Sequence, residues 1–150
     1  MNKIIFVCTG NTCRSPMAEA ILKNKLKLNN ISNYVVSSAG IMAEPLTKTS
    51  TNTIRALKNM GITVKSKPAK QLTKTMLTEN TLLIPITKNH AEYIKNVGKV
   101  KPLCEFSSGI DIPDPYGQDL IVYEKCAKIL DFICDEIVEL IIKGELIWFI

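Results

Sequence analysis

Residues 3–20 read KIIFVCTGNTCRSPMAEA, and this stretch decides the fold. Residues 4–7 are consecutive apolar side chains, a pattern typical of a strand that is buried on both faces of a sheet. A short Gly-Asn turn follows at Gly10. Ser15 and Pro16 then suit the N-cap and the first turn of a helix. The stretch therefore predicts a strand, a tight loop and a helix in direct succession.

The rest of the chain continues this alternation of strands and helices. Further strands are predicted at 34–38, 81–86 and 100–103, and helices at 49–60, 73–77, 88–97 and from about Asp119 onward. Alternation of this kind predicts an α/β fold, a three-layer sandwich with a central, mainly parallel four-stranded sheet and helices on both faces. Pro85 predicts that the 81–86 strand either lies at an edge or ends early.

Length and composition fit one domain spanning residues 1–150, because a chain of 150 residues with 46% hydrophobic side chains can bury a real core. The apolar run after Lys3 is too short for a secretory signal, and no other run could span a bilayer. The five cysteines lack a Cys-x-x-Cys spacing, which favours free thiols in a reducing compartment. We therefore expect a cytoplasmic protein without membrane contact.

The net charge of +5 comes mostly from lysine, since only Arg14 and Arg55 are arginines. The lysines are scattered, without the interleaved aromatic residues of a single-strand binding groove, so we expect no nucleic-acid partner. Two interpretations of the charge stay open: a solvated basic surface, or attraction of acidic or phosphorylated partners. His90 is the only histidine and is expected to be solvated on a surface helix. A His-based triad, a metal site and a cofactor are not expected.

The loop from Cys8 to Ser15 has the features of an anion site. In a parallel sheet the ligand lies beyond the carboxyl ends of the strands, and backbone N–H groups at a helix start favour negative charge. A thiol in this field has its pKa lowered to roughly 3.5–7.5, which predicts that Cys8 is a nucleophile. Arg14 can hold two oxygens of a tetrahedral anion. The alternative, a buried Cys8 beside a surface Arg14, is less favoured because strand, turn and helix start flank the pair.

Residues 7–19, VCTGNTCRSPMAE, resemble the signature of the low-molecular-weight protein tyrosine phosphatases. The resemblance extends over the whole chain in order and length. Residues 38–40 (SAG) resemble the second motif of the family, and residues 114–117 (DPYG) resemble its general-acid loop. Because the signature is specific and two further motifs stand at the family's spacing, coincidence is a poor explanation.

The resemblance implies a hydrolase, a cysteine-dependent phosphoprotein phosphatase that needs no cofactor and acts on phosphorylated proteins as a monomer. Cys8 would form a cysteinyl-phosphate while Asp114, rather than the nearby Asp111, protonates the leaving group. Tyr116 would form a wall beside the substrate. Asn11, Ser15 and Ser38 would support the loop. The implied phosphate-binding residues are Thr9, Gly10, Asn11, Thr12, Cys13, Arg14 and Ser15.

Thr12 bears on the choice of substrate. Many family members have Ile at this position, and the bacterial branch resembling protein-arginine phosphatases has Thr. A shorter, polar side chain can accommodate a planar guanidinium that Ile would crowd. We therefore expect hydrolysis of phosphoarginine on proteins, and phosphotyrosine is the alternative substrate.

Several features leave other interpretations open. A thiol-dependent arsenate reductase shares the Cys-x5-Arg loop, but Cys126 and Cys134 fall on the apolar stripe of the last helix and suit a core better than a disulfide relay. A phosphoprotein-binding module would not need both Cys8 and Asp114. Cys13 could form a protective disulfide with Cys8 or simply pack.

Two segments give less definite expectations. Family members often carry a His, just before an Ala-Arg-Gln stretch, that helps brace the loop Asn. The matching segment here is Lys67-Pro68-Ala69-Lys70-Gln71, which has no His, so the resemblance leaves the brace of Asn11 open. Trp148 and Phe149 end the chain in an apolar tail that either packs on the core or is partly ordered.

Overall fold

A single sheet forms the centre of the computed structural model, which describes residues 1–146. Its neighbouring strands are all parallel and follow the order β2-β1-β3-β4. The strands are β1 (Asn2–Cys8), β2 (Tyr34–Gly40), β3 (Thr81–Pro85) and β4 (Lys99–Val100). The predicted four-stranded α/β fold is confirmed.

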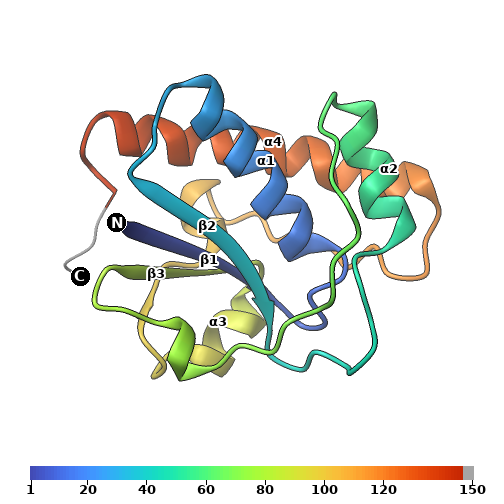
Figure 1. The fold of residues 1–150 in the computed structure, drawn as a ribbon, viewed down its shortest axis with the longest axis horizontal. Helices are drawn as coiled ribbons and strands as arrows, with labels where there is room; N and C mark the ends of the chain where they lie inside the picture. Colours follow the sequence, from blue (N-terminus) through green and yellow to red (C-terminus); the bar gives the residue numbers. More distant parts are fainter. Residues whose placement is uncertain (147–150) are drawn as a thin grey trace.

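Helices cover both faces of the sheet. Figure 1 shows α1, α2 and α4 above the strands and α3 below them. The helices are α1 (Arg14–Leu28), α2 (Thr51–Asn59), α3 (Lys88–Ile94) and α4 (Leu120–Ile142), with short 3₁₀ turns η1 (Lys74–Met76) and η2 (Leu103–Phe106). Among residues 1–146, no helix has the length and apolar character needed to cross a membrane.

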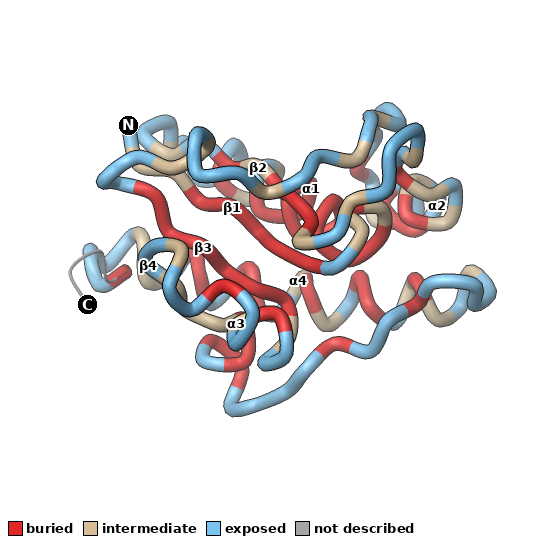
Figure 2. Tube along the Cα trace, turned by 90° about the horizontal axis from the view of Figure 1, so that it is seen from below, coloured by how far each residue is buried: buried red, intermediate tan, exposed pale blue. Residues whose placement is uncertain are grey.

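The side chains of β1 alternate between two buried clusters. Ile4 and Phe6 belong to the larger cluster, which includes residues of α1 and α4. Ile5 and Val7 belong to the smaller cluster on the opposite face, which includes Ile94 of α3. Because both faces of the sheet are covered, its central strands are buried along most of their length, as the burial-coloured trace in Figure 2 shows.

Strand β3 lies inside the sheet, between β1 and β4, so the expected edge position for the strand that contains Pro85 is wrong. The other expectation applies, because β3 ends at Pro85. Pro85 has no N–H to donate, and the next residue supplies the hydrogen bond: the Ile86 N–H donates to the Val7 carbonyl at 2.9 Å. A proline is tolerated at this interior strand because it is the last residue of the ladder.

The structure differs from the sequence-based prediction at the start of α1. Cys13 precedes the first helical residue, and no side chain caps the helix there. The expected N-cap, Ser15, is fully buried inside the first turn and uses its hydroxyl in the loop instead. Trp148 and Phe149, the expected apolar tail, lie outside the described residues.

Sheet order explains where the loop after β1 lies. The chain leaves β1 for its neighbour β2 on one side and later returns as β3 on the other, so the direction of winding reverses at β1. Ligand crevices of open α/β sheets form at such a switch point, beyond the carboxyl ends of the strands. The end of β2 closes on this loop, since a Cβ added to Gly40 would lie 2.5 Å from the Thr9 carbonyl oxygen.

Candidate active site

Cys8 is the last residue of β1, and its sulfur lies at the base of the loop. The side chain is buried, and its Sγ atom is 2.8 Å from the Ser15 hydroxyl oxygen. Burial raises the pKa of the Cys8 thiol, while hydrogen bonds from the Ser15 side chain and backbone, the Asn11 backbone and the charge of Arg14 act in the opposite direction. The expected lowering of the thiol pKa is therefore wrong for this structure, because desolvation outweighs the donors.

Asn11 joins three segments around the loop. Its backbone has φ 58°, a left-handed conformation that Asn adopts more readily than most residues. Its side-chain amide donates to the hydroxyls of Ser15 and Ser38, both at 2.9 Å, and its Oδ1 accepts from the Lys70 N–H at 2.9 Å. The unusual backbone conformation is therefore held by hydrogen bonds from α1, β2 and the segment before η1.

A buried carboxylate extends this network. Glu19 accepts from the Ser38 hydroxyl at 2.7 Å and from the Lys67 ammonium at 2.7 Å on the same oxygen, Oε1. Lys23 donates to Oε2 at 2.6 Å. Burial raises the pKa of Glu19, but these donors outweigh it and hold the pKa below its usual value. Lys67 thus reaches Asn11 through Glu19 and Ser38.

Arg14 and Asp114 meet at the other side of the loop. The Arg14 side chain is 8% exposed, and its guanidinium donates to the Ile112 carbonyl at 3.1 Å and lies 3.7 Å from an Asp114 carboxylate oxygen. Asp114 is more than half exposed and accepts from the Tyr116 N–H at 3.1 Å. The segment 112–116 therefore presents an acid beside the guanidinium, and Asp111 faces the start of α3, where its carboxylate accepts from the Lys88 N–H at 3.5 Å.

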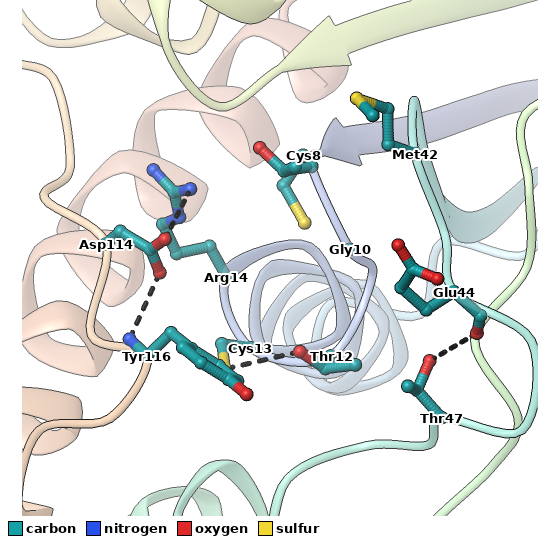
Figure 3. A pocket seen from close by; sticks show the side chains of 11 residues that line it. Cys8, Gly10, Thr12, Cys13, Arg14, Met42, Glu44, Thr47, Asp114 and Tyr116 are labelled. Atoms are coloured by element: carbon teal, nitrogen blue, oxygen red, sulfur yellow. Dashed lines mark hydrogen bonds and ion pairs between the residues drawn. The ribbon is translucent and has the colours of Figure 1, made fainter.

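These groups open into a pocket of about 320 Å³. Figure 3 shows Arg14, Asp114 and Tyr116 on one side of it and Met42, Glu44 and Thr47 on the other, with the Cys8 sulfur between them. Besides Arg14, four predicted phosphate-loop residues, Thr9, Gly10, Thr12 and Cys13, line it, and Asn11 and Ser15 are not among the lining residues. Sequence reasoning missed the wall at 42–47, although its position directly after β2 places it at the same edge of the sheet.

The remaining cysteines are all free and buried. Cys13 lies next to Tyr123, whose hydroxyl is 3.3 Å from its sulfur, and a protective disulfide with Cys8 stays a prediction. Cys126 and Cys134 are buried in the core stripe of α4, as expected. Among residues 1–146, no group of three or more His, Cys, Asp or Glu side chains could hold a metal ion.

His90 is not solvated, so that expectation is wrong. It is 5% exposed, and its Nδ1 accepts from the Thr87 N–H at 3.2 Å, which leaves Nε2–H to donate to the Thr9 hydroxyl at 2.9 Å. Burial, with the positive charge of Arg14, lowers the pKa of His90 to about 4. The spacing of Thr87 and His90 as a capping box at the start of α3 was the signal that could have placed it.

Known proteins share this fold and length. The model of the family "Low molecular weight phosphotyrosine protein phosphatase" matches residues 3–145. A protein-arginine-phosphatase from Geobacillus stearothermophilus is 35% identical, over 91% of this chain and 94% of its own. One from Bacillus subtilis (strain 168) is 36% identical, over 81% of this chain and 85% of its own.

A solved structure agrees with these sequence matches. The YwlE arginine phosphatase from Geobacillus stearothermophilus superposes with a TM-score of 0.84 at 34% identity and covers 97% of this chain and 96% of its own. The family model and these relatives extend over nearly the whole chain. The chain therefore belongs to the low molecular weight phosphotyrosine protein phosphatase family.

Proposed function

We propose that the protein hydrolyses phosphoarginine on proteins, with Cys8 as the nucleophile, Asp114 as the acid and Arg14 as the phosphate clamp. One observation carries the proposal: the sulfur, the guanidinium and the carboxyl group face a single pocket at the start of a helix. A thiol alone at a strand end would be interpreted as a core residue. Here the guanidinium can bind a phosphate beside the thiol, and the carboxyl group can protonate the leaving group.

The reaction proceeds in two displacements. Cys8 first releases its thiol proton to solvent. The thiolate then forms a bond to phosphorus as the bond to the leaving group breaks, and Asp114 gives its proton to that leaving group. Asp114, now a carboxylate, then takes a proton from water while the water oxygen attacks the cysteinyl-phosphate. Inorganic phosphate leaves, and the electron pair of the S–P bond returns to Cys8 as the thiolate.

The loop stabilises charge in both steps. Arg14 and the loop N–H groups are positioned to hold the phosphoryl oxygens, which carry the negative charge in the transition state. Ser15 supports the sulfur: its oxygen accepts from Asn11, so its own hydrogen is available to donate to Sγ at 2.8 Å. This donor offsets part of the desolvation that raises the pKa of Cys8, and it stabilises the thiolate as a leaving group.

Thr12 supports phosphoarginine as the substrate. Its side chain lines the pocket, and proteins named protein-arginine-phosphatase are 35% and 36% identical to this chain. Phosphotyrosine is the second candidate, because Tyr116 presents an exposed aromatic side chain at the pocket wall.

We further propose that residues 1–150 act as one monomeric domain in the cytoplasm, with phosphorylated proteins as substrates and no cofactor.

Two variants test the proposal. Cys8→Ser should abolish hydrolysis of p-nitrophenyl phosphate while the circular dichroism spectrum stays that of the wild type. Thr12→Ile should reduce kcat/KM for a phosphoarginine peptide and preserve it for a phosphotyrosine peptide of the same flanking sequence. If Cys8→Ser retains activity, the nucleophile is wrong. If the wild type does not hydrolyse phosphoarginine, or Thr12→Ile does not change that activity, the substrate is wrong.

A further inference from the structure

The pocket wall opposite Tyr116 is a short segment tied to the phosphate loop. The Ile41 and Met42 N–H groups donate to the carbonyls of Cys8 and Thr9, both at 2.9 Å. Beyond them, the Glu44 carbonyl accepts from the Thr47 hydroxyl at 2.7 Å and from the Thr47 N–H at 3.3 Å, which closes a turn. The backbone of Glu44 is thus fixed relative to the loop that would hold the phosphate.

The Glu44 side chain brings a negative charge to this wall. Figure 3 shows its carboxylate on the pocket side of the segment, across from Asp114. None of the ion pairs formed within residues 1–146 involves Glu44, although 19 of the chain's side chains are Lys or Arg. Arg14 is the one cation among the pocket-lining residues, and it faces the phosphate position. Above that position the pocket therefore carries carboxylates on two opposite walls.

We propose that Glu44 is a specificity-determining residue that favours a phosphorylated guanidinium over a phosphorylated phenol in this pocket. The inference rests on the proposed function of the same site and names the charge that would select its substrate. Both substrates carry the same phosphate, so its repulsion from Glu44 cancels in the comparison. The groups next to phosphorus differ, since a guanidinium is cationic and a tyrosine ring is neutral. A carboxylate near that group stabilises only the cation.

Glu44→Gln tests the proposal, because it keeps the size of the side chain and removes the charge. Glu79→Gln is the matched control, since Glu79 is also exposed but precedes β3 at the opposite edge of the sheet. We expect Glu44→Gln to lower the ratio of kcat/KM for phosphoarginine and phosphotyrosine peptides by about two- to fivefold at low salt. The effect should shrink in 1 M NaCl, where the screening length is about 3 Å. A ratio that equals that of Glu79→Gln overturns the proposal.

A second measurement separates this proposal from the choice of substrate. Ethylguanidinium and its neutral isostere ethylurea are compared as inhibitors of p-nitrophenyl phosphate hydrolysis. Glu44→Gln should weaken inhibition by ethylguanidinium about two- to fivefold and leave inhibition by ethylurea unchanged. If this occurs in a wild type that fails to hydrolyse phosphoarginine, the substrate proposal is wrong and recognition of the cation by Glu44 stands. If both inhibitors respond equally, the role of Glu44 is wrong whatever the substrate.

Discussion

Lys67 donates to both carboxylate oxygens of Glu19, a buried residue 48 positions away in the sequence. The same Glu19 accepts from Ser38, which itself accepts from Asn11 of the phosphate loop. A permanent cation thus stands at the far end of a hydrogen-bond chain that begins at the loop. A histidine at this position would carry a charge that depends on pH, because free imidazole has a pKa of about 6.5.

Removing this cation should loosen the loop. In Lys67→Gln the buried Glu19 keeps only Lys23 as a cationic partner, so its hold on Ser38, and through it on Asn11, weakens. We expect kcat for p-nitrophenyl phosphate to fall about three- to tenfold, because a misplaced loop stabilises the transition state less well. Lys65→Gln, at an exposed site in the same segment, should leave kcat unchanged.

Lys67→His makes the same role visible in a pH profile. The imidazolium replaces the ammonium at low pH, and the variant then loses activity relative to the wild type as pH rises through the pKa of the new histidine. A Lys67→Gln variant with wild-type kcat, or a Lys67→His variant that follows the wild-type profile at every pH, would show that the brace does not act on the loop.

Ser15→Ala should raise the pH at which Cys8 reacts. The Ser15 hydroxyl is a donor that lowers the pKa of the thiol against the effect of burial, so its removal raises that pKa further. The rate of alkylation of Cys8 by iodoacetamide, followed against pH by mass spectrometry, should show its midpoint at higher pH than in the wild type. Cys126, buried in α4, serves as the internal control for access. A midpoint at or below that of the wild type would contradict the assigned donor.

The buried His90 should make stability depend on pH between about 4 and 6.5. Its folded pKa of about 4 lies below the ordinary value of 6.5, so the unfolded chain binds a proton first as the solution is acidified. The stabilisation from a neutral His90 is fully present above pH 6.5 and is lost as pH falls towards 4, by at most about 3 kcal/mol. Arg14 opposes protonation, and Asp111 and Asp114 favour it less strongly than burial opposes it.

Urea unfolding of the wild type and His90→Gln at pH 7.5 and pH 4.5 measures this dependence. The wild type should lose more unfolding free energy on acidification than the variant does. Contributions from Glu19, whose stabilisation is lost only below its ordinary pKa of 4.5, are common to both proteins and cancel. Equal losses in the two proteins would mean that His90 is not held neutral.

The sequence predicted the parts of the fold that depend on local pattern. The apolar run at 4–7 lies in β1, and the apolar stripe after Asp119 lies on α4. Both were predictable because a strand buried on two faces and a helix buried on one face each produce a characteristic spacing of apolar residues. For the strand that contains Pro85, the local pattern allowed two predictions, an edge position or an early end, and could not decide between them. The choice depended on which strands lie beside β3, and that is a property of the whole sheet.

The site was predictable where a motif is continuous and was missed where it is assembled from distant segments. Residues 8–15 and 114–116 were predicted from two continuous motifs, and Cys8, Arg14, Asp114 and Tyr116 from these motifs line one pocket. His90 and Lys67 contact residues far away in the chain, and Glu44 lines a pocket that distant segments form together. A single sequence carries no information on such contacts. The pKa of Cys8 was misjudged for a related reason: the donors are local, but the burial that outweighs them comes from the whole fold.

Substitution of Gly40 tests whether the motif at residues 38–40 must lie close to the phosphate loop. A Cβ at this position would lie 2.5 Å from the Thr9 carbonyl oxygen and 3.2 Å from the Asn11 nitrogen, and both obstacles are backbone atoms that cannot rotate away. Gly40→Ala should therefore lower the free energy of unfolding by about 1–3 kcal/mol. It should also lower kcat, because relief of the clash displaces the residues that hold the phosphate.

Gly10→Ala is the matched control for stability. Its added Cβ would meet only the Thr12 hydroxyl oxygen, at an ordinary contact distance of 3.9 Å. Urea titrations of both variants decide the point. If Gly40→Ala unfolds at the same urea concentration as Gly10→Ala, the loop yields easily and close approach is not what requires glycine. If only Gly40→Ala is destabilised, the end of β2 sets the shape of the phosphate loop through backbone contact, and the second motif is needed for the first to form.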